Sequence, residues 1–418
     1  MKQNETKDNK YSEIKEGDYR MYICHEVVTI QHLDYPKVLK IEKVKMNVEE
    51  CDLKILSGLN VLSVIRPHAI LGVIALDHHF YLIYVTTAEI VGTIQDAEIY
   101  KLLEVDYIPL FNDEEQVPSF EIINYLCNIK NLLTMGFYYS FKYDLTTSLQ
   151  KQVRNKLAKK DEFEKKFYWN YNINRKLFEA KVNQIFTVKF IFGYVNISEA
   201  TISGEKIMLA IISRRSNKHA GTRYNTRGIT DEGNVANFVE TEQILKIKKS
   251  LYSVILLRGS APIFFEQSPL NFQVSISRNP SMSSPAFLKH LEGIQKEFKY
   301  VLMMNLMSES KKDEELISNN FKNQFLINNI NNCKYHQFDI HDVCKKDSFE
   351  KLEDYIDEKL GTIIENFNFF CYNEEKQITT SEQKGVFRIN CLDCLDRTNI
   401  FESRIAWQVL LYQVIYNN

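Results

Sequence analysis

A short polar loop between a strand-like run and a helical pattern is the feature that most constrains this sequence. The run GVFRIN, residues 385–390, has the length and residue types of a buried strand. It leads into the polar stretch CLDCLDR, and a helical pattern follows with apolar residues at Phe401, Ile405, Val409 and Leu410. A strand that turns tightly into a helix points several backbone N–H groups at one place, where the helix dipole also favours negative charge. The segment is therefore typical of an anion-binding loop.

Cys391 and Arg397 give this loop a candidate chemistry. Cys391 begins the loop, where the N–H groups and the helix dipole would lower the pKa of its thiol and leave a nucleophilic thiolate at neutral pH. Arg397 follows and can fold back to hold two phosphate oxygens. Amides and a guanidinium stabilise such charge without a metal ion. The Cys-x5-Arg spacing alone is weak evidence in a chain with eight cysteines. The position of Cys391 between a strand and a helix is what supports an anion-binding loop.

Two other interpretations compete with an anion-binding thiolate. Cys391 and Cys394 form a Cys-x2-Cys, which is typical of a redox pair or of half a zinc site. A dithiol pair gives Arg397 and the nearby carboxylates no role, which disfavours it. The more regular metal spacing lies in CKYHQFDIHDVC, where the possible ligands are Cys333, His336, His341 and Cys344. That order of ligands is uncommon in zinc fingers, so we interpret these four as structural or loop residues and expect no metal or cofactor.

The composition predicts a soluble, folded protein of one large or two medium domains. The 418 residues are 44% hydrophobic and 25% charged, and the net charge of −2 gives no global field that would attract nucleic acid. The best apolar stretch, 61–76, is interrupted by Arg66 and His68 and is too short to span a bilayer. Eight cysteines in a chain whose polar start lacks a signal-peptide pattern favour reduced thiols and a cytoplasmic location.

The first half of the chain predicts a mostly β domain. From residue 19 to about 110, runs rich in β-branched and aromatic residues alternate with turn signals. The polar tip Asp77-His78-His79 is interpreted as a hairpin turn. One helix is predicted over 120–135, because its apolar residues recur with helical spacing.

The second half alternates strand runs with amphipathic helices, which predicts an α/β domain with a mixed sheet. The fold class is therefore α/β (α+β). The Asn-biased tract 318–332 is predicted to be a surface loop or insert. We expect four segments: a disordered N-terminus over 1–18, a mostly β subdomain over 19–150, a helical junction over 151–180 and the α/β domain over 181–418.

The stretch RINCLDCLDRTN, residues 388–399, resembles the signature of the SAC-domain (suppressor-of-actin) phosphoinositide phosphatases. Further blocks are similar to that family in the same order, among them YLIYVTTAEIVGTI, FYYSFKYDLTTSLQ, LLRGSAPIFFEQ and YVLMMNL. The resemblance covers the chain from about residue 60 to its end and is closest to the phosphatidylinositol-4-phosphate phosphatase branch. It implies hydrolysis of a phosphate from the inositol ring of a membrane lipid, with phosphatidylinositol 4-phosphate favoured, from a peripheral position at endoplasmic reticulum or Golgi membranes.

The resemblance also implies roles for the loop residues. The Cys391 thiolate would attack phosphorus and form a phosphocysteine that water hydrolyses, while Arg397 holds the transferring oxygens. Asp393 is the first candidate and Asp396 the second for the general acid, and a structural hydrogen bond is the alternative role for each. The loop residues that are candidates for contacting substrate are Asn390, Cys394, Thr398 and Asn399.

A cluster of cations lies farther along the family-like blocks. Arg214, Arg215, Lys218, Arg223 and Arg227 fall within one short, glycine-broken segment. Such a run is usually a solvated face. Because an anionic headgroup is expected here, we interpret Arg215, Lys218, Arg223 and Arg227 as a basic rim that contacts lipid headgroups at the membrane surface. The stretch ETEQ, residues 240–243, is expected to support that segment from inside.

The intact loop also helps to decide between the phosphatase and other functions that the same sequence could have. A phosphoinositide-binding scaffold with weak catalysis would have no chemical reason to retain both Cys391 and Arg397. A protein phosphatase using the same loop is disfavoured by the family-like blocks. Only 21 residues follow Arg397, whereas the family's domains usually continue, so either the chain is a fragment that has lost its C-terminal part and membrane anchor or the domain ends early. Protein partners are not indicated by any motif.

Overall fold

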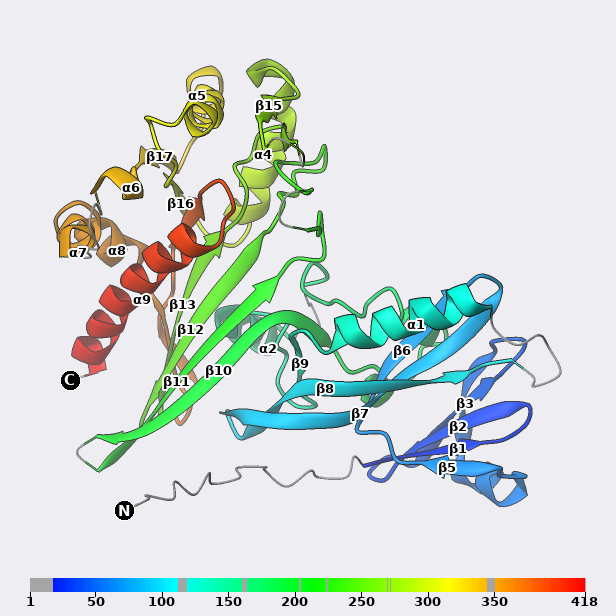
Figure 1. The fold of residues 1–418 in the computed structure, drawn as a ribbon. Coiled ribbons are helices and arrows are strands. Elements are labelled where there is room, and N and C mark those ends of the chain that lie inside the picture. Colours follow the sequence, from blue (N-terminus) through cyan, green and yellow to red (C-terminus); the bar gives the residue numbers. More distant parts are fainter. Residues whose placement is uncertain are drawn as a thin grey trace, which may run out of the picture. The chain divides into compact units, whose positions relative to one another are not determined.

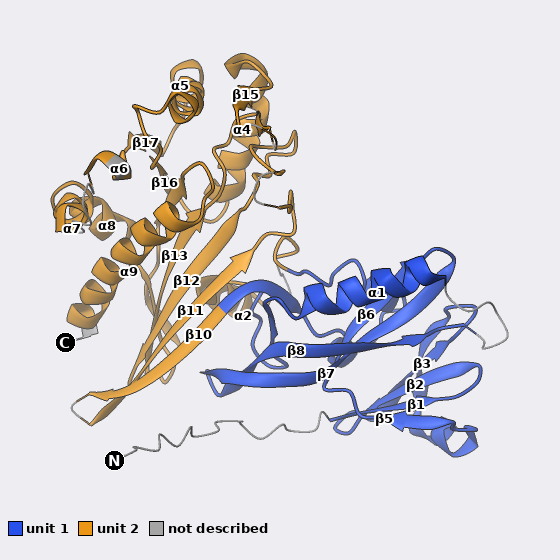
Figure 2. Cartoon of the chain, in the orientation of Figure 1, with its two compact units in different colours: residues 1–146, 168–194 blue, residues 147–167, 195–418 orange. Residues whose placement is uncertain are grey.

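The computed structural model describes residues 18–111, 119–159, 164–202, 204–222, 225–268, 270, 272–343 and 350–417. The chain divides into two compact units: unit 1 is residues 1–146 with 168–194, and unit 2 is residues 147–167 with 195–418 (Figure 2). The segment borders expected from the sequence at 150 and 180 stay predictions. The expected disordered N-terminus, apart from Asp18, lies outside the described residues.

Unit 1 contains two groups of antiparallel strands. The first has the order β4-β3-β2-β1-β5 and consists of β1 (Tyr19–Ile23), β2 (Val27–His32), β3 (Lys37–Glu42), β4 (Val48–Asp52) and β5 (Ser63–Ile65). The second consists of β6 (Ala69–Leu76), β7 (His79–Ile94), β8 (Ala97–Pro109), β9 (Phe137–Tyr139) and the start of β10 (Phe190–Ile202). Leu76 pairs with His79 across a turn in which Asp77 adopts a φ of 54°, so the predicted hairpin is confirmed.

Helices in unit 1 are few and short. Helix α1 (Phe120–Leu133) confirms the helix predicted over 120–135; Ser119 caps its first turn by accepting a hydrogen bond from the N–H of Ile122. Its buried side chains, Leu126 and Leu133, lie seven residues apart on one face. The remaining short helices are η1 (Leu53–Gly58), α3 (Arg175–Glu179) and η2 (Gln184–Phe186).

Unit 2 is built on a mixed sheet, which confirms the predicted α/β fold class. The strand order is β17-β16-β20-β13-β12-β11-β10, and β18 and β19 pair beside β13. Figure 1 labels β10 to β13, β16 and β17 of this sheet. The three pairs β17–β16, β16–β20 and β20–β13 are parallel, and β13–β12–β11 are antiparallel. The strands are β11 (Glu205–Arg215), β12 (Val239–Ile247), β13 (Ser250–Arg258), β16 (Tyr300–Asn305), β17 (Cys333–Gln337), β18 (Phe370–Asn373), β19 (Ile378–Ser381) and β20 (Gly385–Asn390).

Helices cover both faces of this sheet. On one face α4 (Pro280–Gln295) and α5 (Lys312–Ile327) contribute Phe287 and Phe321 to a core that contains Val301 and Val386. The other face packs under α7 (Glu350–Tyr355), η3 (Ile356–Leu360), α8 (Gly361–Phe367) and α9 (Asp396–Asn417). Because β16 is buried on both faces, it reads as a nearly continuous apolar run, YVLMM, whereas β20 is interrupted by the buried Arg388.

Three smaller elements complete unit 2: helices α2 (Leu149–Ala158) and α6 (Ile340–Val343), and the hairpin of β14 (Phe265–Gln267) and β15 (Val274–Ile276). Among the described residues, no helix combines the length and the apolar character needed to cross a bilayer.

The prediction of a surface loop over 318–332 is wrong for 318–327, because α5 extends to Ile327, whereas 328–332 do form a loop before β17. Ile317, Phe321 and Gln324 are buried on one face of this helix, and Phe321 packs its ring against Phe287 of α4. The helical spacing of these buried residues outweighs the turn preference of the many asparagines.

Candidate active site

β20 ends at Asn390 in the middle of the parallel part of the sheet. It pairs with β16 on one side, where Asn390 lies opposite Asn305, and with β13 on the other. Residues 391–395 connect β20 to α9, which begins at Asp396 (Figure 1, where α9 is red). α/β proteins usually bind their ligands at the carboxyl edge of such strands. The connecting loop 391–395 therefore lies where a ligand is most easily bound.

Cys391 carries the most reactive side chain of the loop. It is buried, and its Sγ accepts a hydrogen bond from the N–H of Cys394 at 3.0 Å. Its pKa is lowered to about 6, first by hydrogen bonding from the Cys394 side chain, then by the charge of Arg397 and the N–H groups of Leu395 and Cys394, against the opposing effect of burial. At neutral pH the group is therefore a thiolate.

Cys394 differs from Cys391 in both conformation and chemistry. Its φ of 54° is left-handed, which turns its own N–H back toward Cys391. Its Sγ lies 3.2 Å from the carbonyl oxygen of Cys391, and both thiols are free. Burial, together with the neighbouring Cys391, raises the pKa of Cys394 well above its usual range. Cys394 is therefore a neutral thiol that supports the thiolate beside it.

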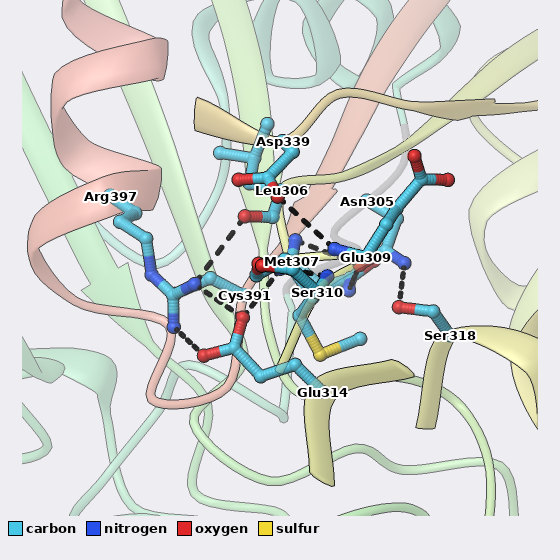
Figure 3. A network of polar contacts seen from close by, with 12 residues as sticks. Asn305, Leu306, Met307, Glu309, Ser310, Glu314, Ser318, Asp339, Cys391 and Arg397 are labelled. Atoms are coloured by element: carbon cyan, nitrogen blue, oxygen red, sulfur yellow. Dashed lines mark hydrogen bonds and ion pairs between the residues drawn. The ribbon is translucent and has the colours of Figure 1, made fainter. Parts of the chain in front are cut away.

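Arg397 forms a two-pronged ion pair with Glu314 of α5 (Figure 3). Its Nη1 donates to Oε2 at 2.8 Å and its Nη2 donates to Oε1 at 3.0 Å. Glu314 Oε2 also accepts from the N–H of Ser308 at 2.6 Å, which ties the pair to the segment after β16. Both side chains are largely buried. The carboxylate of Glu314 thus fixes the plane of the guanidinium, and the positive charge of Arg397 still lowers the pKa of Cys391.

Arg227 is bound to the loop. Its Nη2 lies 2.5 Å from Oδ1 of Asp393, and its Nη1 donates to the carbonyl oxygen of Leu392 at 3.0 Å. Its Nε and Nη2 also donate to Oε1 of Gln267. Arg227 is only 7% exposed, so it braces the loop from within. In this conformation Asp393 accepts a hydrogen bond, and Asp396 is exposed at the start of α9.

The remaining loop candidates lie in the scaffold or at the surface. Asn390 is buried and its Nδ2 donates to Oδ1 of Asn305 at 2.6 Å. Thr398 is buried and its hydroxyl donates to the carbonyl oxygen of Leu395 at 2.9 Å, inside the first turn of α9. Asn399 is exposed on α9. Asn390 and Thr398 therefore fix the two ends of the loop.

The cation segment divides between core and surface. Arg215 donates to the carbonyl oxygen of Gly221 at 2.7 Å and to Oδ1 of Asn237 at 3.1 Å, and burial, with the charge of Arg258, lowers its pKa. Lys218 is exposed, and Arg223 lies outside the described residues. Of the four predicted rim residues, Lys218 is the exposed one within the described part.

Arg214 is the most deeply buried cation of the same segment. It is 0% exposed, and its two terminal nitrogens pair with Glu240 and Glu242 at 2.6 Å each. These two carboxylates belong to the stretch ETEQ, so the predicted internal support for the segment is confirmed. A cation that is paired on both sides can be buried at tolerable cost.

Several residues around the loop were not assigned a role from the sequence, although Arg388 belongs to the family-like stretch. Arg388 is buried and donates to the carbonyl oxygens of Gly259 at 2.8 Å and Ser260 at 2.5 Å. Burial, with Arg388 beside it, keeps the pKa of His290 well below its usual range, so the neutral ring can accept from Arg388 Nε at 3.3 Å. These contacts join the strand before the loop to the ends of β13 and α4.

Arg258 and Glu402 support the loop from another side. Arg258 Nη1 donates to the carbonyl oxygen of Cys394 at 2.6 Å, and its Nε lies 3.7 Å from Glu402 Oε2. Burial raises the pKa of Glu402 to about 7. Arg258 lies in the family-like block LLRGSAPIFFEQ, but its contact with the loop, like those of Glu314 and Glu402, is identified only by the folded structure.

The alternative zinc cluster is only partly described. Burial alone raises the pKa of Cys333 to about 12, as expected for a core thiol in β17. His336 packs at 5.8 Å from the ring of Tyr355. Cys344 and the side chain of His341 lie outside the described part of the chain. Within the described part, no group of three or more metal-binding side chains is found. The assignment of these residues as structural stays an interpretation.

Comparison with known proteins gives a consistent match. Residues 68–345 match the family model described as the SacI homology domain; this range ends before Cys391. Synaptojanin-2 of Homo sapiens is 33% identical over 345 residues, 80% of this chain and 22% of that protein. Phosphatidylinositol-3-phosphatase SAC1 of Drosophila melanogaster is 32% identical over 358 residues, 82% of this chain and 58% of that protein. Polyphosphatidylinositol phosphatase INP53 of Saccharomyces cerevisiae is 33% identical over 297 residues, 66% of this chain and 27% of that protein. The chain thus spans at most about three fifths of these relatives.

Proposed function

The chain belongs to the SacI homology domain family, and we propose that it hydrolyses a phosphate monoester from the inositol ring of membrane phosphoinositides. The observation that carries the proposal is Cys391, a thiol with a pKa of about 6 at the end of the central parallel strand, beside the charge of Arg397. The names of two relatives, SAC1 and INP53, describe phosphatases that act on phosphatidylinositol derivatives. A low-pKa thiolate beside a guanidinium is the arrangement that attack on a phosphate monoester requires.

The proposed reaction has two steps. In the first, the Cys391 thiolate attacks phosphorus, a sulfur–phosphorus bond forms and the bond to the inositol oxygen breaks. In the second, water attacks the phosphocysteine, inorganic phosphate leaves and the thiolate is restored. The N–H groups of the loop and the guanidinium of Arg397 stabilise the charge of the transferring oxygens in both steps.

The leaving inositol oxygen needs a proton, and Asp393 remains the first candidate to supply it, with Asp396 the second. Oδ1 of Asp393 accepts from Arg227, so the proton to be donated would be carried by Oδ2. Replacing the general acid should greatly slow hydrolysis of the inositol ester but hardly slow an aryl phosphate with an acidic leaving group. Equal losses on both esters for Asp393→Asn would transfer the role to Asp396.

The preferred ring position is a finer proposal. The resemblance of the sequence to the family's 4-phosphatase branch favours phosphatidylinositol 4-phosphate, whereas the Drosophila SAC1 relative is named for the 3-phosphate. We therefore propose the 4-phosphate, with the 3-phosphate as the isomer to compare. The proposed location is the cytoplasmic surface of endoplasmic reticulum or Golgi membranes.

Phosphate release from vesicles that contain phosphatidylinositol 4-phosphate tests the function directly. With EDTA present, the unmodified chain should release phosphate, and Cys391→Ser, which keeps the size of the side chain, should release none. Release by the serine variant would exclude the thiolate mechanism. Vesicle binding without release by a folded unmodified chain would instead favour the alternative, a phosphoinositide-binding scaffold with weak catalysis.

A further inference from the structure

The hairpin of β14 and β15 carries the most exposed apolar side chain of the described residues of unit 2. Leu270 is 93% exposed and Phe272 is 52% exposed, both between the two strands. From Gln267 to Ser277 the sequence QSPLNFQVSIS contains no charged residue, in a chain where a quarter of the residues are charged. A single exposed leucine needs no explanation, but an uncharged turn that presents Leu and Phe together indicates a contact with an apolar environment.

The base of the hairpin is well ordered by hydrogen bonds. Ser268 and Gln273 are joined by an N–H to carbonyl bond of 3.0 Å, and the N–H of Phe272 donates to the carbonyl oxygen of Ser268 at 2.9 Å. Phe272 has a φ of 58°, a left-handed conformation that a phenylalanine rarely adopts. Below the turn, Phe265 and Val274 belong to the core of unit 2. The described base of the hairpin is thus hydrogen-bonded and packed on the core of unit 2.

The hairpin is connected to the active-site loop through Arg227. Gln267, the last residue of β14, accepts hydrogen bonds from Arg227 Nη2 at 2.6 Å and Nε at 3.1 Å. The same guanidinium contacts Asp393 and the carbonyl oxygen of Leu392. Figure 1 shows β15 beside α4 on unit 2. Whatever the hairpin contacts is therefore placed close to the loop.

We propose that the β14–β15 hairpin inserts Leu270 and Phe272 into the boundary between headgroups and acyl chains of an anionic phospholipid bilayer. This inference rests on the proposed function, in which the phosphate to be cleaved lies at headgroup level. An uncharged turn enters the headgroup layer without burying a charge, and burial of a Leu and a Phe side chain provides the favourable free energy. A bilayer suits this turn better than a protein surface, because the phosphate to be cleaved would lie at headgroup level and Arg227 bonds the hairpin directly to the loop that would cleave it.

The first test separates membrane docking from catalysis. The variant Leu270→Ser/Phe272→Ser is compared with Leu326→Ser, which removes a leucine that is 72% exposed on α5. Hydrolysis is measured on phosphatidylinositol 4-phosphate in phosphatidylserine-containing vesicles and on its water-soluble short-chain form. We expect the hairpin variant to lose tenfold or more on vesicles and to change less than twofold on the soluble substrate, with Leu326→Ser like the unmodified chain on both.

Failure of this inference and failure of the proposed function give different results. Equal vesicle activity for the hairpin variant and the unmodified chain overturns the insertion and leaves the phosphatase intact. No hydrolysis of the soluble substrate by the unmodified chain counts against the phosphatase itself. Sedimentation velocity tests whether the hairpin instead contacts a second copy of the chain. If the unmodified chain and Leu326→Ser are dimers and the hairpin variant is a monomer, the turn mediates self-association and the membrane proposal is overturned.

A second test needs no activity. Leu270→Trp and, as control, Leu326→Trp are mixed with vesicles whose acyl chains carry bromine, which quenches tryptophan only at short range. The two native tryptophans, Trp169 and Trp407, give the background measured in the unmodified chain. We expect strong quenching for the hairpin tryptophan and background quenching for the control. Background quenching for both variants, with the protein bound to the vesicles, overturns the insertion.

Discussion

Two arginine–glutamate ion pairs have different roles in this protein. Arg214, in the cation segment, is 0% exposed and balanced by Glu240 and Glu242. Arg397, at the loop, is paired with the single carboxylate of Glu314 and remains 16% exposed. Arg214 pairs with two buried carboxylates, whereas Arg397 pairs with one and lies at a site that Cys391 shares. The difference in exposure and in the number of carboxylate partners separates a structural arginine from one that can bind an anion.

The largest effect is expected from Arg214→Met. The substitution leaves two buried carboxylates without their cation, so we expect the free energy of unfolding to fall by about 3–5 kcal/mol. Urea unfolding followed by circular dichroism measures the loss. Adding Glu240→Gln and Glu242→Gln to the same variant should restore much of the stability, because neutral amides are less costly to bury than charges. A loss below about 1 kcal/mol would show that Arg214 is better hydrated than its burial indicates.

Arg397→Lys should lower kcat/KM by about 100-fold or more with little change in stability, because a lysine keeps the charge but loses the two-pronged geometry. Glu314→Gln should lower it about 10-fold, since the guanidinium loses the carboxylate that fixes its plane. Glu315→Gln, on the exposed side of the same helical turn, is the matched control. A rise in activity for Glu314→Gln would mean that the carboxylate restrains Arg397 and competes with substrate.

The sequence predicted those parts of the fold whose signals are local. The hairpin at Asp77, the helix that begins at Phe120 and the strand–loop–helix around Cys391 each follow from a short run of residues with one clear periodicity or turn signal. The mixed sheet followed from the alternation of such runs. The helix α5 was missed, because its asparagine content hid the four-residue spacing between Ile317 and Phe321.

The candidate site could be predicted only as far as its motif extends. Arg397 and Glu314 are 83 residues apart, and Arg227 and Asp393 are 166 residues apart, so no local pattern indicates either pair. The cation segment shows the same limit of sequence-based prediction for burial. Its charges suggested a surface, but burial is decided by partners such as Glu240, which a single sequence does not assign.

The pH dependence of the reaction tests the contrast between the two cysteines. Activity should rise with pH as Cys391 ionises, with a midpoint near its pKa of about 6. Cys394→Ala removes the largest cause of the lowered pKa, so the rise should move to higher pH, whereas Cys394→Ser keeps a donor and should move it less. A shift of one pH unit lowers activity at pH 6 about fivefold. The shift is measured from pH profiles of kcat/KM for the unmodified chain and the two Cys394 variants, because the substrate titrates identically in all three. Superimposed profiles would show that Cys394 does not lower the pKa of Cys391.

The smallest effect is expected from Lys218→Ala, the surface counterpart of Arg214. An exposed cation near an anionic membrane contributes about 1 kcal/mol, so vesicle binding should weaken about fivefold at low salt. Screening should remove the difference at high salt, because the charge is solvated in both states. Stability should not change, in contrast to Arg214→Met. Vesicle co-sedimentation over a range of salt concentrations compares Lys218→Ala with Lys359→Ala, an exposed lysine between α7 and α8. Equal losses for the two lysines would mean that the protein senses only its net charge, and Lys218 would then have no place in a basic rim.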